Sequence, residues 1–134
     1  MKEIVIDEKT KYCIKLSVED TGAGLACILT GGERPHVGAV ALIDGADGFD
    51  ASHEVGNCGE NRDMGRLVGV QELHCNGHKD HIAALEVARI INKHYGQAVS
   101  VAAGIHIDDA SADDIERLRR NWIAAAEQYC RDNL

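Results

Sequence analysis

The hydrophobic period of this chain changes once, and that change limits the folds open to it. In the first part, apolar and polar residues alternate, most clearly over residues 12–18, where Tyr12 shares one side with Ile14, Leu16 and Val18. Alternation at every second residue indicates a half-buried strand. In the last third, apolar residues recur at steps of three and four, as they do on a helix. The sequence therefore predicts strands first and helices later.

The predicted strands are short and lie close together in the sequence. The first four favour an antiparallel meander, because consecutive strands joined by turn residues usually pair with one another. A stretch rich in glycine and acid, residues 44–63, separates them from the fifth and is predicted to be a long loop. Loops of that length are usually functional or mobile, and we expect this one to be mobile. The five expected strands cover residues 3–6, 12–18, 23–30, 37–43 and 65–74.

Two helices and one further strand complete the pattern. We expect a helix at residues 79–95, a strand at 97–103 and a second helix from Ser111 to about Arg131. Gly96 stands where a C-terminal cap would fall, and Ser111 with an acid three residues on resembles a capping box. The stripes expected to face the core are Ile82, Ala84, Leu85, Ala88, Ile91 and Tyr95 on the first helix, and Ile115, Leu118, Trp122, Ala126 and Tyr129 on the second.

The length of the chain, 134 residues, suits one hydrophobic core and is too short for two. We predict a single domain over residues 1–134 in the α/β (α+β) class. Its mixed sheet would begin with an N-terminal antiparallel meander and continue as β-α-β-α, with the helices packed on the sheet.

Composition excludes several classes of partner. The formal net charge of −8 argues against binding nucleic acid and against docking on an anionic membrane. No apolar run approaches the roughly twenty residues of a membrane-spanning helix, and the first residues do not read as a signal peptide. The five cysteines are widely spaced, without a C-x-x-C pair, which predicts reduced thiols and a cytoplasmic location.

Histidines and carboxylates are expected to converge at one edge of the sheet. Residues 65–74, the first helix and residues 97–103 form a strand–helix–strand unit. If both strands are parallel in one sheet, their carboxyl ends share an edge, where open α/β sheets bind ligands. His74 and His78 would follow the first strand, and His106 and Asp108 the second.

The chemistry of this edge allows several ligands. Imidazole and carboxylate together suit a divalent transition metal, and helix-start amides beside Lys79 suit a phosphate or carboxylate. Other roles stay open at this point. Each histidine could be a cap or turn residue, Asp108 and Asp109 could only satisfy amides near the second helix start, and glycines such as Gly31 could serve turn geometry.

Three motifs resemble those of the prenylated-flavin chaperone (LpdD-like) family, whose founding type is a small accessory protein associated with gallate-type decarboxylases. They lie at residues 31–40 (GGERPHVGAV), 77–80 (GHKD) and 104–108 (GIHID), in this order. The resemblance runs from about residue 10 to 120. It implies a fold similar to the proteasome-assembly chaperones, a sheet flanked by helices, and a homodimer.

The resemblance also implies a function. Such a protein would bind prenylated FMN and help to load or mature it in a UbiD-like aromatic-acid decarboxylase, without carrying out the decarboxylation. His36, His78 and His106 would line the site or hold a divalent transition metal. By resemblance, the cofactor-binding residues are Gly31, Gly32, His36, Gly77, His78, Lys79, Asp80, His106 and Asp108.

Two other functions are compatible with the same residues. The three histidines could make the chain a small metalloenzyme of unknown substrate. Alternatively, the protein could be an assembly chaperone that acts through protein contacts only, and the motifs would then be turn and cap chemistry. His74, Cys75 and His81 fall outside the family motifs.

Overall fold

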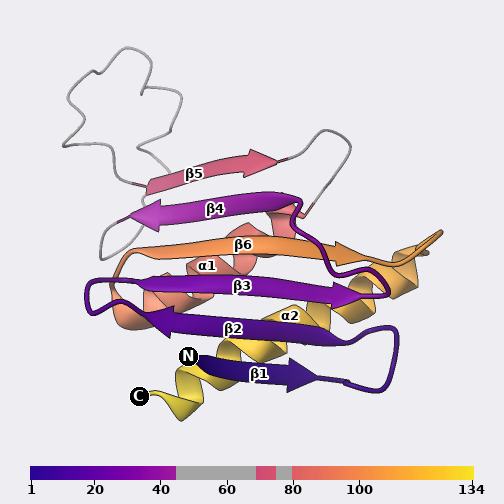
Figure 1. The fold of residues 1–134 in the computed structure, drawn as a ribbon, viewed down its shortest axis with the longest axis horizontal. Coiled ribbons are helices and arrows are strands. Elements are labelled where there is room, and N and C mark those ends of the chain that lie inside the picture. Colours follow the sequence, from indigo (N-terminus) through magenta and orange to yellow (C-terminus); the bar gives the residue numbers. More distant parts are fainter. Residues whose placement is uncertain (45–68, 75–79) are drawn as a thin grey trace.

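A mixed sheet with two helices makes up the described part of the protein (Figure 1). The structure is a computed structural model that describes residues 1–44, 69–74 and 80–134. The predicted α+β class is confirmed. In chain order the elements are β1 (Lys2–Ile6), β2 (Ile14–Asp20), β3 (Leu25–Gly32), β4 (Ala39–Asp44), β5 (Gly69–His74), α1 (His81–Tyr95), β6 (Val99–His106) and α2 (Ala112–Asp132).

The order of strands in the sheet is β1-β2-β3-β6-β4-β5. The predicted antiparallel meander holds for β1, β2 and β3. The fourth strand departs from it, because β6 lies between β3 and β4, parallel to the first and antiparallel to the second. The six residues 99–104 of β6 carry only small or apolar side chains apart from Ser100, which suits a central strand with a neighbour on both sides.

In the half of the sheet formed by β3, β6, β4 and β5, three strands end and one begins at the same edge. β5 and β6 are both antiparallel to β4, so they run in the same direction, and β3 runs with them. The predicted convergence of the two strand ends is therefore confirmed, with β4 between the two strands. We call this edge, where β3, β5 and β6 end and β4 begins, the carboxyl edge (right in Figure 1).

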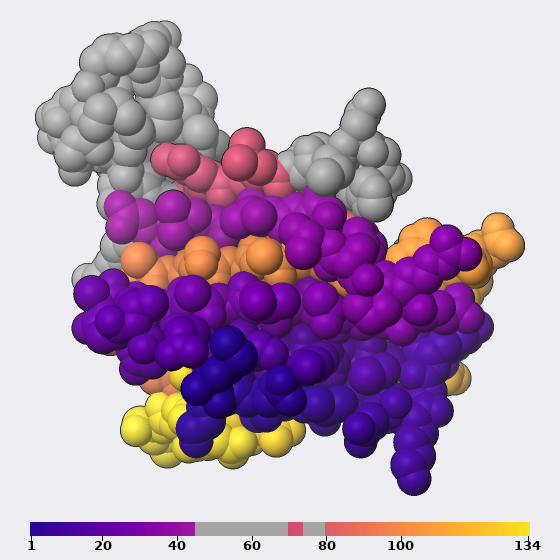
Figure 2. Space-filling view, in the orientation of Figure 1, coloured from indigo at the N-terminus to yellow at the C-terminus, as the bar shows by residue number. Residues whose placement is uncertain are grey.

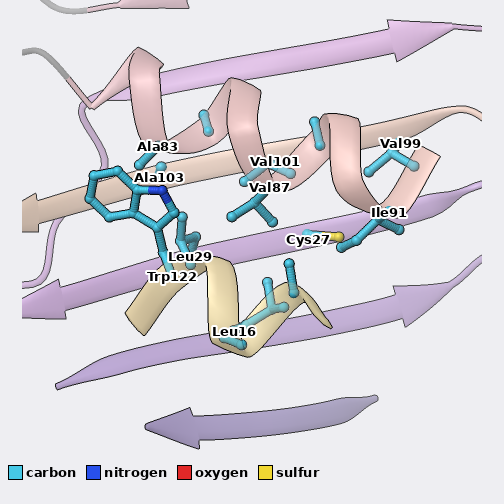
Figure 3. Close-up of a cluster of buried hydrophobic side chains, with 14 of the residues drawn as sticks. Leu16, Cys27, Leu29, Ala83, Val87, Ile91, Val99, Val101, Ala103 and Trp122 are labelled. Carbon is cyan, nitrogen blue, oxygen red and sulfur yellow. The ribbon is translucent and has the colours of Figure 1, made fainter. Parts of the chain in front are cut away.

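Both helices pack on one face of the sheet, and that layer holds the core (Figure 3). Alternate residues of the strands, such as Leu16, Leu29 and Val101, are fully buried against the helices. On the opposite face, seen in Figure 2, no helix of the described residues packs. We call it the open face; it exposes Ile28, Val40, Leu42 and Leu73.

The predicted core stripes are confirmed except at the first turn of each helix. Ile82 is 49% exposed and Ile115 is 50% exposed. Both predictions were wrong for the same reason. Each helix starts at the carboxyl edge, where the sheet ends, and in α1 it is the neighbouring Ala83 and Ala84 that face the strands.

The predicted helix ends are confirmed by their caps. Gly96 adopts the left-handed conformation after α1, and its N–H donates to the carbonyl of Asn92. Ser111 and Asp114 form a reciprocal capping box at the start of α2. Of the predicted loop 44–63, Asp44 ends β4 and the remainder lies outside the described residues. Within the described ranges, neither helix is long and apolar enough to cross a membrane.

Candidate functional site at the carboxyl edge of the sheet

The connection from β3 to β4 crosses the end of β6 and brings two predicted histidines together. The amides of Glu33 and Arg34 donate to the carbonyl of His106 at 2.7 and 3.2 Å. These bonds place the His36 ring beside that of His106, with centroids 6.5 Å apart in an edge-to-face arrangement. The sequence pattern gives no geometric reason to place His36 here. The reason is that β4 lies next to β6 in the sheet, so the connection from β3 to β4 passes the end of β6.

A hydrogen-bonded pair, His36 and Asp80, joins this connection to the start of α1. The Nε2 atom of His36 lies 2.9 Å from Oδ2 of Asp80, whose side chain is only 7% exposed. The other carboxylate oxygen accepts from the backbone N–H of Ile105 at 2.9 Å. Asp80 occupies the N-cap position of α1 but makes no capping hydrogen bond with its side chain. Its carboxylate instead connects α1, β6 and the β3–β4 connection.

Both ring nitrogens of His36 have hydrogen-bond partners. The Nδ1 atom lies 2.9 Å from the carbonyl oxygen of Arg34, and a carbonyl can only accept, so Nδ1 donates. The Nε2 atom faces the Asp80 carboxylate. These two contacts fix the orientation of the imidazole ring at the carboxyl edge.

A second histidine–carboxylate contact lies nearer to solvent. The Nε2 atom of His106 is 3.0 Å from one oxygen of Asp108, and Arg34 donates to the other oxygen at 3.0 Å. Glu33 accepts from the Asp108 amide at 2.9 Å. The carboxylate of Asp108 thus pairs with side chains, whereas the start of α2 is capped by Ser111. The interpretation of Asp108 as a residue that only satisfies helix amides is wrong.

The glycines predicted to bind the cofactor lie in the last two positions of β3. Gly31 and Gly32 pair with Ile105 and His106. Gly32 has a φ of 75°, in the left-handed region, and a Cβ atom there would collide with the His106 carbonyl. Glycine is therefore needed at Gly32 for the backbone to turn against β6. Contact of these glycines with a cofactor stays a prediction.

A pocket of about 640 Å³ opens beside these polar groups. It lies among the first turns of both helices and the residues that follow β6, and its lining is mainly apolar. Asp80 and His106 belong to this lining, so the pocket and the polar network share an edge. Concave apolar sites with a few polar groups are the usual form of small-molecule sites. The lining residues are Asp80, Ile82, Ala83, Ile105, His106, Ile107, Ala110, Ile115, Leu118, Arg119 and Trp122.

An ion pair between the two helices, Glu86 with Arg119, lies at one side of the pocket. Glu86 accepts from the indole N–H of Trp122 at 2.9 Å and from Nε of Arg119 at 3.1 Å. A further nitrogen of Arg119 lies 2.8 Å from the second oxygen of Glu86. The bidentate contact holds the guanidinium at the pocket and the indole in one orientation. Trp122 is the only tryptophan in the chain.

Some predicted site residues lie outside the described residues, namely Gly77, His78 and Lys79. Their roles stay predictions. Where the structure describes the chain, no group of three or more His, Cys, Asp or Glu side chains is placed to hold a metal ion. The three-histidine metal site with His36, His78 and His106 therefore has no support from the described residues.

The fold and the site define a small α+β protein with a ligand pocket at the carboxyl edge of its sheet. The family model of the prenylated flavin chaperone LpdD-like domain matches residues 8–133, nearly the whole chain. The chain belongs to this family, which confirms the resemblance of its three motifs. No curated protein matches it.

The sequence alone missed most of the pocket. Ile82 and Ile115 were predicted as core residues, and Arg119 and Glu86 carried no motif. Arg34 lies in the same motif as His36 but was not among the predicted site residues, and the structure pairs it with Asp108.

Proposed function

We propose that this protein binds prenylated FMN at the carboxyl edge of its sheet and assists its loading into, or maturation within, a UbiD-like aromatic-acid decarboxylase. It would do so without catalysing the decarboxylation. The observation that carries this proposal is the apolar pocket that shares an edge with the His36–Asp80 and His106–Asp108 pairs. Membership of a prenylated flavin chaperone family supports the choice of ligand.

The residues present fit such a cofactor. A prenylated flavin combines a flat, largely apolar ring system with an anionic phosphate. The pocket offers apolar walls, and Arg119 with His106 supplies cationic or hydrogen-bonding groups at its lining. Trp122 is the aromatic side chain of that lining. In the proposal, His36, Asp80, His106 and Asp108 hold and orient the polar groups of the cofactor.

The remaining predicted cofactor ligands are part of the same proposal. His78 and Lys79 directly precede Asp80 in the sequence, and Gly31 and Gly32 end the strand beside His106. A cytoplasmic location, expected from the reduced cysteines, also belongs to it. The proposal does not require a divalent metal, and the experiment below compares binding with and without one.

Binding is tested by equilibrium titration of the purified protein with prenylated FMN and with FMN, each with and without a divalent metal. We expect saturable binding of prenylated FMN, followed through Trp122 fluorescence. A matched variant, Asp108→Asn, removes the charge that holds His106 and Arg34 and should weaken binding. If neither flavin binds, the proposal is wrong.

The proposal includes a homodimer, and the open face supports it. Four residues lie directly across neighbouring strands on this face: Ile28, Ala102, Val40 and Leu73. Three of them are exposed large apolar side chains. A second sheet packed face to face would remove this surface from water. Light scattering should give the mass of a dimer, and Val40→Lys with Leu42→Lys should give a folded monomer; a monomeric wild type contradicts this part.

A further inference from the structure

The two helix-start isoleucines, Ile82 and Ile115, are unusual for exposed residues. Their stripes are otherwise buried, yet each of them is about half exposed. Exposed apolar side chains are common singly and need no explanation. These two, however, come from different helices and line the same pocket. Their exposure is therefore part of one concave apolar surface.

The floor of that surface is made by core residues. Leu118 is 4% exposed and Trp122 is 6% exposed, and both belong to the pocket lining. The walls are the two half-exposed isoleucines. An occupant that covers this floor and these walls removes apolar surface from water without burying a charge. The chemistry of the pocket thus favours an uncharged, branched hydrocarbon group.

Two of the three charged or polar side chains of the pocket lie together, and the third, Arg119, is paired with Glu86 on the helices. Asp80 and His106 line it from the sheet and the start of α1, where they also contact His36 and Asp108. A ligand with one polar part and one hydrocarbon part can satisfy both regions at once. A prenylated flavin meets this description, because it differs from FMN by an added five-carbon hydrocarbon unit.

We propose that the pocket walled by Ile82 and Ile115 receives the prenyl-derived hydrocarbon unit of the cofactor and thereby distinguishes prenylated FMN from FMN. This assignment rests on the proposed function. It makes the two isoleucines specificity-determining residues, whereas the polar pairs contact the groups common to both flavins. Hydrocarbon pockets discriminate by about 10- to 200-fold for a single methylene.

The test compares dissociation constants of the wild type and of the double variant Ile82→Ala, Ile115→Ala for both flavins. We expect the wild type to prefer prenylated FMN by at least about tenfold, in line with the discrimination of hydrocarbon pockets. The double variant should lose most of that preference and keep its affinity for FMN within about twofold. Because both isoleucines are half exposed, the variant should remain folded, which circular dichroism checks.

Val5→Ala is the control. Val5 is a β-branched apolar residue on β1 that is 40% exposed, and it belongs neither to the pocket lining nor to the four residues of the proposed dimer contact. It should leave the preference unchanged. A second variant, Ala110→Phe, fills the pocket from an exposed position and should weaken binding of prenylated FMN more than that of FMN.

Two kinds of failure are distinguishable. If the wild type binds both flavins and the double variant weakens both equally or neither, the pocket assignment is overturned and the proposed function stands. If the wild type binds neither flavin, both are overturned. A preference lost equally in Val5→Ala would also contradict the assignment.

Discussion

The contact between His36 and Asp80 predicts a measurable energetic coupling between two residues 44 positions apart. Asp80 is 7% exposed at its side chain and accepts from His36 and from the Ile105 amide, both at 2.9 Å. Leaving a buried hydrogen-bonding group without its partner costs about 1–3 kcal/mol. The His36 side chain is 25% exposed, so water replaces part of what this side chain loses. We therefore expect Asp80→Ala to lower the free energy of unfolding by about 2 kcal/mol.

A double-mutant cycle isolates the pair from the other contacts of each residue. The variants are Asp80→Ala, His36→Gln and their combination, and the assay is urea unfolding followed by Trp122 fluorescence. Asp80→Ala also removes the acceptor of the Ile105 amide, but this loss is common to the single and the combined variant and cancels in the cycle. The combined variant should be more stable than the sum of the single losses predicts, by about 1–2 kcal/mol, because the second change removes a contact already lost.

The control for this cycle is His94→Gln. His94 is an exposed histidine near the end of α1, so its replacement should change stability by no more than about 0.5 kcal/mol. Losses of Asp80→Ala and His36→Gln that simply add, within about 0.5 kcal/mol, would contradict the coupling. Additivity would mean that the two side chains are not coupled in solution.

Three further predictions concern single sites. Gly38→Ala should destabilise the carboxyl edge and release the His36–Asp80 pair, because a Cβ atom there would collide with the Asp80 carboxylate. Urea unfolding measures the loss, and a loss of the same size in an Asp80→Ala background, which lacks the colliding atoms, would contradict this cause. Hydrogen bonds from Ser111 and Tyr12 lower the pKa of Asp114 from 3.8 to about 2. The ionised Asp114 therefore stabilises the fold fully above pH 3.8, and this stabilisation is lost as the pH falls toward 2. Asp114→Asn should flatten the acid-unfolding curve in that range, and an unchanged curve would count against this prediction. Burial raises the pKa of the Cys27 thiol to about 12, so mass spectrometry should find it unalkylated by iodoacetamide at pH 8 until the protein unfolds.

Local elements of this fold could be predicted because their signals are local. Alternation located β2, and the cap residues Gly96 and Ser111 marked helix ends that the structure confirms. The pairing of β4 with β6 could not be predicted, since nothing in residues 37–43 distinguishes β3 from β6 as a neighbour. Strand order depends on long-range pairing, and the sequence pattern carries little information about it.

The candidate site was predictable where it depends on strand direction and unpredictable where it depends on packing. His106 and Asp108 were expected at the carboxyl edge from the β-α-β unit alone. The pocket was not, because the helical period assigns Ile82 and Ile115 to the buried stripes. A stripe reaches the core only while the sheet lies beneath it, and periodicity does not show where the sheet ends.

The position of β4 explains why one short segment carries both structural and site residues. Gly38 donates to the carbonyl of Ala103, and from there β4 runs antiparallel to β6 with Ala39 opposite Ala103. Only two residues separate His36 from the start of this strand. Because side chains alternate along a strand, a shift of one residue would turn the buried positions of β4 to the open face. The same pairing that buries Ala39 and Ile43 therefore also sets the distance from His36 to Asp80 and to His106. The register of β4 thus determines both the packing of this strand and the geometry of the site.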